Sequence, residues 1–398
     1  MAGKLLRDVV ITGAARTPTG KFMGALSETS ATQLGATAIR AAVERAGIKP
    51  GDVEYTYMGN MLSAGLGQTP ARRAAIEAGV PATTSAMTIN KACASGLASV
   101  ALAAQMIQLG EAETVAAGGM ENMSASPHLL VNSRTGQRLG DGKLVDHMIH
   151  DGLWCPFENR HMGGSAEAIA GKYGLVREEL DEFALRSHLR ASSAVTEGAF
   201  DAETAPVSVK TRAGTVEVKR DEAPRADTSI VKLAKLGTVF QETGCVTAGN
   251  SSSIADGAAA VVVSSQDKAM KAGVKPVARI TGYAHAANEP GWLFDAPPAA
   301  VEKLLARTGE SLKDFDLIEV NEAFAAQVVA NGRALGWDTD RVNVWGGAIA
   351  LGHPIGASGA RILVTLLYGL NRIGGRKGMA VICHAGGGAM AMSVERVA

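Results

Sequence analysis

Two cysteines and one histidine lie in short glycine-containing segments that suit nucleophilic and acid–base chemistry. Cys93 precedes an Ala-Ser-Gly turn and a helical pattern, and Cys383 ends an apolar run that leads into the glycines of residues 385–389. His353 stands between them in the sequence, flanked by a glycine and a proline. A thiolate is a strong nucleophile, a neutral imidazole can take its proton, and a second thiol can serve as a separate acid or base. These three side chains predict catalysis through a covalent cysteine intermediate.

The start of a helix is a favourable place for a nucleophilic thiol. Backbone N–H groups and the positive end of the helix dipole stabilise a thiolate, so we expect the pKa of Cys93 to be low. Its small neighbours, Ala94 and Gly96, also leave room for a substrate carbonyl. A single cysteine is more often a buried structural side chain, and this is how we interpret Cys155 and Cys245.

Cys383 and Asn321 both follow predicted strand ends, where the active sites of α/β proteins gather. The glycines after Cys383 expose backbone N–H groups that can form an oxyanion hole. The Asn321 side chain can hold a water that polarises a carbonyl, or it can cap a helix. The residues alone leave both roles of Asn321 open.

Composition argues against several classes of protein. The 398 residues carry 39 basic and 39 acidic side chains, so neither nucleic acid nor an anionic membrane is expected as the main partner. Four cysteines without Cys-x-x-Cys spacing predict neither a disulfide framework nor a metal site. The signature loops of a nucleoside triphosphatase and of a Rossmann dehydrogenase are both missing.

The sequence also shows no targeting pattern. The first residues lead into Val9 without a long apolar stretch, and residues 395–398 carry no address that we recognise. No segment approaches ~18 uninterrupted apolar residues. We therefore expect a cytoplasmic protein without a membrane span.

Strand-like and helix-like segments alternate through the first third of the chain, which predicts an α/β protein built from parallel βαβ units. The predicted strands are residues 9–12, 53–58, 86–89 and 114–117, and the predicted helices are residues 31–45, 69–78 and 97–109.

The last third of the chain repeats this scheme. The helical pattern of residues 39–47 recurs at 301–309, and the Ala-Ser-Gly turn of residues 94–96 recurs at 357–359. Because the matches keep the same order, we interpret the chain as a duplicated fold. A polar insertion at residues 124–244 separates the two copies.

The sequence resembles the thiolase family over almost its whole length, and most closely the biosynthetic acetyl-CoA acetyltransferases. Five strings carry the resemblance: residues 90–96 (NKACASG), 161–163 (HMG), 247–250 (TAGN), 321–327 (NEAFAAQ) and 346–354 (GGAIALGHP). The resemblance implies a thiolase-like duplicated αβαβα layered fold with a loop-domain insertion.

The resemblance also implies how the chain is divided and assembled. Residues 1–120 and 245–275 would form the amino-terminal half, residues 121–244 the loop domain, and residues 276–398 the carboxy-terminal half. The loop domain would bind coenzyme A and join two dimers into a homotetramer.

The expected reaction is the reversible condensation of two acetyl-CoA molecules to acetoacetyl-CoA and CoA, without a cofactor or metal. By resemblance, Cys93 is the nucleophile that becomes acetylated. His353 activates it and, with a water held by Asn321, stabilises the enolate oxygen. Cys383 removes the α-proton of the second acetyl-CoA. The backbone N–H groups of Cys93 and Ala385 would form the second oxyanion hole.

The coenzyme A tunnel is also assigned by resemblance. Its expected lining residues are Leu153, His161, Met162, Arg225, Ala248, Gly249, Ser252, Ala323 and Phe324.

Two segments depart from the common family pattern. After Cys383 the chain has His384 and Ala385 where many members have a small or neutral residue and then glycine. Ala385 keeps its backbone N–H, whereas His384 is expected to perturb the Cys383 thiol in a direction that the sequence does not give. Residues 291–297 resemble the Phe-bearing segment of acetoacetyl-CoA thiolases that accept a 2-methyl branch.

Three other functions therefore remain as alternatives. The first is a 3-ketoacyl-CoA thiolase of β-oxidation with a broader or 2-methyl-branched acyl range. A non-catalytic acyl-CoA or lipid-binding protein on the same fold is less favoured, because the set of Cys, His, Cys and Asn is intact. A ketoacyl synthase is also less favoured, since that family relies on one cysteine with two histidines or a His–Asn pair.

Overall fold

The computed structural model describes residues 7–212 and 214–397. Residues 1–6 and 398, on which part of the targeting expectation rests, lie outside the described residues.

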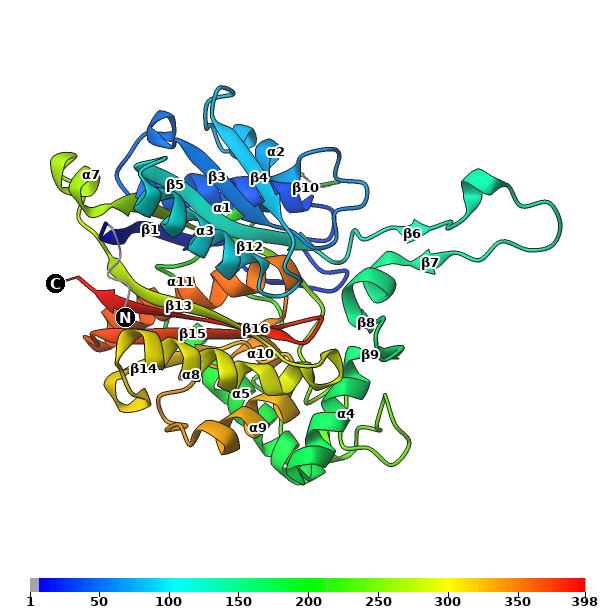
Figure 1. Cartoon of the computed structure of the whole chain (residues 1–398). Helices are drawn as coiled ribbons and strands as arrows, with labels where there is room; N and C mark the ends of the chain where they lie inside the picture. Colours follow the sequence, from blue (N-terminus) through cyan, green and yellow to red (C-terminus); the bar gives the residue numbers. More distant parts are fainter. Residues whose placement is uncertain (1–6, 213, 398) are drawn as a thin grey trace.

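Ten strands of the described chain form one continuous hydrogen-bonded sheet in two parts, the first and the second sheet. With three groups of helices these two parts form five layers (Figure 1). The first sheet contains β1 (Val9–Arg16), β2 (Gly20–Lys21), β3 (Tyr55–Gly59), β4 (Ser85–Ile89), β5 (Thr114–Asn122) and β12 (Ala255–Ser265). The second contains β13 (Ala278–Ala287), β14 (Leu317–Val320), β15 (Lys377–His384) and β16 (Gly388–Arg396). A short pairing between β1 and β13 joins the two sheets.

Helices cover both sheets on both faces. α1 (Ala31–Arg45) and α2 (Pro70–Glu77) pack on the outer face of the first sheet. α8 (Ala296–Thr308) and α9 (Ala325–Leu335) pack on the outer face of the second. The middle layer is α3 (Ser95–Leu109) and α11 (Ile355–Ile373), whose side chains share one apolar cluster with both sheets.

The two sheets repeat one topology. The order β3-β5-β12-β1 in the first matches β14-β15-β16-β13 in the second. In both, the first neighbouring pair is parallel and the next two are antiparallel. The counterpart of β4 is reduced to a bridge between Ile318 and Val342. This repetition confirms the predicted duplicated α/β fold.

The expectation of parallel units holds for β3, β4 and β5 in the first sheet and for β14 and β15 in the second. β1 is antiparallel to β12. Two parallel neighbours are joined by a crossover connection, usually a helix. β12 instead follows the insertion and is not joined to β1 by such a crossover. The sheets are therefore mixed.

The middle helices are apolar on nearly every face because they lie between two sheets. One stretch in the described part of the chain, Ala92–Leu109, is long and apolar enough to cross a membrane, but 67% of it is buried inside the protein. It contains α3, a core helix of the central layer.

The insertion between β5 and β12 forms short elements beside the two sheets. They are β6 (His128–Leu129), β7 (Val145–Asp146), β8 (Trp154–Cys155), β9 (Arg160–His161), α4 (Met162–Tyr173), α5 (Arg177–Thr196), β10 (Val207–Thr211), β11 (Gly214–Val218) and α6 (Ile230–Ala234). The remaining helices are α7 (Gln266–Lys271), which follows β12, and α10 (Ala348–Leu351), which precedes α11.

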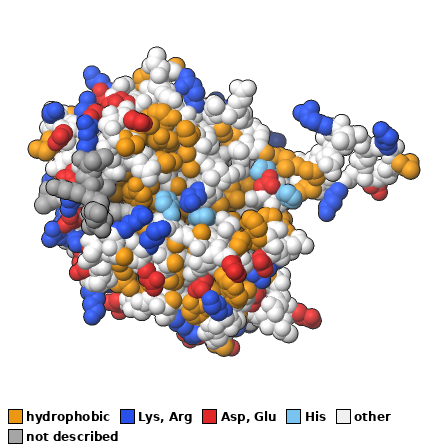
Figure 2. Space-filling view, in the orientation of Figure 1, with side chains coloured by type: hydrophobic (Ala, Val, Ile, Leu, Met, Phe, Trp, Pro, Cys, Tyr) orange, Lys and Arg blue, Asp and Glu red, His pale blue; other side chains and the backbone are white. Residues whose placement is uncertain are grey.

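A long arm leaves the body of the molecule between β6 and β7 (Figure 1). Hydrophobic side chains cover its root, and basic side chains gather toward its far end (Figure 2). Leu139, near the tip, is 97% exposed, and Leu144 is also exposed.

Buried ion pairs attach the rest of the insertion to both halves. The Arg16 guanidinium at the end of β1 bonds Glu203 and makes two hydrogen bonds, of 2.7 and 2.9 Å, to Asp221. Thr365 of α11 donates a 3.1 Å hydrogen bond to the same Glu203 carboxylate. Removing one member of such a group leaves a buried charge uncompensated, so this contact fixes the insertion in place.

Candidate active site

One cavity of about 590 Å³ has both predicted catalytic thiols and the predicted histidine in its wall. Cys93 comes from the loop before α3, His353 from the loop before α11, and Cys383 from the end of β15. The two halves of the fold therefore contribute to a single site.

A tight loop presents Cys93 to the cavity. The Ser95 hydroxyl donates to the Ala92 carbonyl at 2.6 Å and accepts from the Lys91 N–H at 2.7 Å. Ala92 adopts a left-handed conformation with φ of 47°. Ala94 is the residue before the first helical turn, so Cys93 lies just outside α3 rather than in it.

The Cys93 thiol is neutral in the resting protein. Burial raises its pKa to about 12, although the backbone N–H groups of Ala385 and of Cys93 itself lower it by hydrogen bonding to the sulfur. The expected low pKa is therefore wrong, because loss of hydration outweighs the stabilisation by local N–H groups. A neutral thiol needs a base to remove its proton as it reacts.

His353 is held as the tautomer that can act as this base. The Ser358 hydroxyl donates to the Pro354 carbonyl at 2.8 Å, so its oxygen is free to accept from His353 Nδ1 at 2.5 Å. The ring proton thus stands on Nδ1 and Nε2 is left as the acceptor. Burial, together with the nearby Arg361 charge, lowers the pKa of His353 to about 3, so the ring is neutral.

Asn321 lies next to that acceptor nitrogen. Its Nδ2 is 3.5 Å from His353 Nε2, and its backbone N–H bonds the Val381 carbonyl at 2.9 Å. Phe324, not Asn321, is the residue that precedes α9. The helix-capping role is therefore excluded. Within the described residues the buried Asn321 Oδ1 has no hydrogen-bond partner, so it remains available as an acceptor.

Cys383 is 1% exposed and is paired with Ala389 across the β15–β16 hairpin. Burial and the neighbouring Cys93 raise its pKa well above the usual value. His384 is not among the causes of this shift. Its ring bonds the Ala385 carbonyl instead, at 2.8 Å.

Eight of the nine predicted tunnel residues line the same cavity. They are Leu153, His161, Met162, Arg225, Ala248, Ser252, Ala323 and Phe324. The exception is Gly249, whose Cα faces Leu233 and Leu236 of the α6 region.

An aromatic group forms part of this wall. The rings of His161 and Phe240 are stacked at 4.7 Å, and Phe324 packs edge-on against Phe240 and Phe294 at 6.3 and 5.5 Å. Leu293 and Phe294, from the segment that departs from the family pattern, also line the cavity.

The other two cysteines lie outside the cavity lining. Cys155 is buried in an apolar cluster, and the Cys245 thiol donates to Glu167 at 3.4 Å. Within the described residues no group of three or more His, Cys, Asp or Glu side chains is arranged to hold a metal ion.

Sequence reasoning missed two supporting residues. Ser358 fixes the His353 tautomer. Its position five residues after His353, in the Ala-Ser-Gly string of residues 357–359, was a usable signal. Glu121 at the end of β5 accepts from the backbone N–H groups of Met61, Leu62 and Gly356 at 2.8 to 3.1 Å. It ties the first turn of α11 to the first sheet. A lone glutamate in an apolar strand gave no indication of this.

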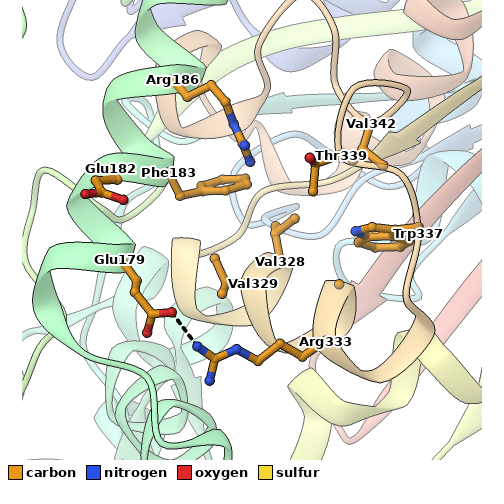
Figure 3. A pocket seen from close by; sticks show the side chains of 11 residues that line it. Glu179, Glu182, Phe183, Arg186, Val328, Val329, Arg333, Trp337, Thr339 and Val342 are labelled. Carbon is orange, nitrogen blue, oxygen red and sulfur yellow. Dashed lines mark hydrogen bonds and ion pairs between the residues drawn. The ribbon is translucent and has the colours of Figure 1, made fainter.

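A second cavity, of about 500 Å³, lies between α5 and α9 (Figure 3). Its wall includes the apolar side chains of Phe183 and Trp337 and several charged ones. Arg333 pairs with Glu179, and the Arg186 guanidinium lies 5.2 Å from the centre of the Phe183 ring. It holds none of the predicted catalytic residues, so the first cavity is the candidate active site.

Comparison with known proteins agrees with this geometry. Residues 9–267 match the family described as thiolase, N-terminal domain, and residues 274–396 match thiolase, C-terminal domain. An acetyl-CoA acetyltransferase from Cupriavidus necator is 51% identical over 98% of this chain and 100% of its own length. One from Escherichia coli is 50% identical with the same coverage. The crystal structure of the Bacillus anthracis acetyl-CoA acetyltransferase superposes with a TM-score of 0.97 at 42% identity, covering 98% of this chain and 99% of that one.

Proposed function

Because the chain belongs to the thiolase family, we propose that it is an acetyl-CoA C-acetyltransferase that condenses two acetyl-CoA molecules to acetoacetyl-CoA and CoA, reversibly. The observation that carries the proposal is the shared cavity of two protonated thiols and one neutral imidazole. The names of the relatives support the same substrate.

The first half-reaction is acyl transfer to Cys93. The sulfur attacks the thioester carbonyl while His353 Nε2 takes the thiol proton. The N–H groups of Cys93 and Ala385, which both bond the sulfur in the resting protein, are placed to bind the oxyanion of the tetrahedral intermediate. CoA leaves with a proton from Cys383, so this step ends with an acetylated Cys93, an imidazolium and a Cys383 thiolate.

The second half-reaction forms the carbon–carbon bond. The Cys383 thiolate takes the α-proton of a second acetyl-CoA, and the carbanion attacks the acetyl group on Cys93. A buried thiolate is a strong base, which suits a proton as weakly acidic as this one. The Cys93 sulfur then recovers its proton from His353, so protons and charges balance over the cycle. The imidazolium, with a water on Asn321, is placed to stabilise the enolate oxygen.

Coenzyme A would enter along the part of the cavity formed by the insertion. Arg225 of the insertion and Lys21 of β2 supply positive charge at the cavity, and His161 and Met162 of the insertion form a largely apolar wall with Phe324 from the loop before α9. This matches a ligand with phosphate groups at one end and an uncharged thioester arm at the other.

Variants of the two thiols test these roles. Cys93→Ser is expected to abolish covalent labelling by radiolabelled acetyl-CoA. Cys383→Ala is expected to become labelled, more slowly because the departing CoA must take its proton from another donor, yet to form no acetoacetyl-CoA, because it lacks the base for the second half-reaction. Normal condensation by Cys383→Ala would contradict the assigned roles. Binding of acetyl-CoA without any labelling of the wild-type chain would favour a non-catalytic protein instead.

A broader acyl range is the second candidate, and Leu293 and Phe294 in the cavity wall favour it. Thiolysis rates on acetoacetyl-CoA, 2-methylacetoacetyl-CoA and 3-ketohexadecanoyl-CoA separate the possibilities. The main proposal predicts the highest rate on acetoacetyl-CoA. A preference for the long chain would identify a β-oxidation enzyme.

We also propose a homotetramer in the cytoplasm, in which residues 121–244 act as the loop domain between halves formed by residues 1–120 with 245–275 and by residues 276–398. Two surfaces support the assembly. β4 is the edge strand of its sheet and exposes Met87, and the arm exposes Leu139 and Leu144 to solvent. Unpaired edge strands and exposed apolar surface can serve as contacts with another chain.

A further inference from the structure

His384 lies beside the reacting sulfurs, yet the proposed reaction gives it no role. Its side chain lines the same cavity as Cys93, Cys383 and Ala385. It is the last residue of β15, and the turn of residues 385–387 then leads into β16. Ala385 in that turn supplies the N–H that bonds the Cys93 sulfur.

The ring of His384 is hydrogen-bonded to the turn through its Nδ1 atom. Its Nδ1 lies 2.8 Å from the Ala385 carbonyl oxygen. A carbonyl oxygen can only accept, so Nδ1 carries the proton. Burial lowers the pKa of His384, the hydrogen bond to the Ala385 carbonyl raises it, and the electrostatic effect of Lys91 before α3 and of His285 on β13 lowers it further. The ring is therefore neutral, with Nε2 unprotonated.

The β15–β16 hairpin leaves space for this ring. A Cβ placed on Gly388, opposite His384, would lie 2.2 Å from both Cε1 and Nε2 of the ring. Gly388 does not have a positive φ, so its backbone conformation does not require glycine. Glycine is needed at residue 388 because a side chain there would occupy the space that the His384 ring fills.

We propose that His384 is a positioning residue for acyl transfer: its Nδ1–H holds the Ala385 carbonyl, which fixes the peptide group on the carboxyl side of Ala385 and restricts rotation about Ala385, so that the Ala385 N–H on the other side stays directed at the Cys93 sulfur. The inference rests on the proposed function, since the oriented N–H matters only if an oxyanion forms at Cys93. Gly386 and Gly387, which follow Ala385, would otherwise leave its carbonyl side free to rotate. Pre-orienting a donor is how an oxyanion hole gains its effect.

Isosteric variants separate this role from simple filling of space. The amide nitrogen of His384→Asn can take the place of Nδ1, whereas that of His384→Gln takes the place of Nε2 and cannot reach the Ala385 carbonyl. We expect His384→Ala and His384→Gln to lower the single-turnover rate of Cys93 acetylation by about 10- to 100-fold, as misplacement of a catalytic donor does. His384→Asn should recover most of the rate. The KM for acetyl-CoA should change by less than about 3-fold, because the step affected follows binding.

Gly388→Ala provides an independent variant. It should displace the ring and slow acetylation as His384→Ala does, while adding no further loss in the His384→Ala background, where the space is already free. Circular-dichroism melting of each variant shows whether it is folded.

The outcomes separate the two proposals. If wild-type chain is not acetylated by acetyl-CoA, the proposed function fails. If wild type is acetylated and all three His384 variants match it, or if Asn, Gln and Ala are equally slow, only the positioning role is overturned.

Discussion

Cys93 and His353 begin the proposed reaction, and their protonation states are set by burial rather than by local sequence. Cys93 is held as a thiol and His353 as a neutral ring, so neither of these two side chains is charged before substrate arrives. Thiol proton transfer is then coupled to attack on the thioester. The Ser358 hydroxyl keeps Nε2 free for that transfer.

This arrangement predicts how acetylation depends on pH. A lowered histidine pKa means that the neutral base persists at every pH above about 3, and the Cys93 thiol stays protonated up to about 12. At saturating acetyl-CoA, the single-turnover rate of Cys93 acetylation should therefore vary little between about pH 5.5 and pH 8, the range in which an ordinary histidine titrates. Stopped-flow measurement across that range tests this. If the rate fell as the pH was lowered, with a midpoint near pH 6.5, His353 would be titrating as an exposed ring.

That Cys93, His353 and Cys383 line one cavity could be predicted from the sequence, because their strings combine rare side chains with glycine turns. Their protonation states could not, since desolvation depends on what packs around them. The pKa of Cys93 was predicted in the wrong direction for this reason. Asn321 shows the same limit: both of its roles fitted the sequence, and only the position of the α9 start separated them.

Helices α3 and α11 cross closely at two glycines. A Cβ on Gly359 would lie 2.6 Å from the backbone nitrogen of Leu97, and one on Gly96 would lie 2.8 Å from that of Ala360. The loops that carry Cys93 and His353 lead directly into these two helices. The distance between the helices therefore sets the distance between nucleophile and base.

Gly359→Ala is expected to force the helices apart, with a loss of about 1–3 kcal/mol in the free energy of unfolding, typical of overpacking. Acetylation of Cys93 should slow as well. Urea denaturation and single-turnover kinetics measure the two effects. Gly171→Ala in α4 is the matched control: nothing lies within 4 Å of its Cβ, so it should leave the rate unchanged and raise stability by about 0.5–1 kcal/mol. Equal behaviour of the two variants would contradict the crossing argument.

Element prediction was good where apolar periodicity was strong and poor where strands are made of small residues. The predicted helix at residues 97–109 differs from α3 by two residues at its start. The predicted strands at residues 9–12 and 114–117 extend in the structure to Arg16 and Asn122. Their added residues include Gly and Ala, which carry little strand preference. They are extended because β12 pairs with them along their length.

At the scale of the whole molecule, the arm between β6 and β7 extends away from the body and exposes apolar side chains to solvent. Its apolar residues do not contact either core. Replacing residues 130–143 by a short Gly-Ser turn should convert a tetramer into a dimer, because the arm is the proposed contact between dimers. Light scattering coupled to size exclusion measures the mass. The double variant Leu139→Ser, Leu144→Ser should weaken the tetramer without shortening the chain.

A mass unchanged by removal of the arm would exclude it as the tetramer contact. Wild type that is already dimeric would exclude the tetramer itself. Neither result would affect the assignment of the thiols, which lie in the body of the chain.

The place of β12 in the first sheet has a consequence for synthesis on the ribosome. It lies between β1 and β5, yet it is made after both of them and after the whole insertion. Until residue 265 has left the exit tunnel, β1 lacks its main partner and β5 keeps an open edge. Unpaired edges of this kind promote association between incomplete chains. From the completion of β5 at Asn122 until that of β12 at Ser265, the nascent protein therefore carries its first sheet in two unjoined parts.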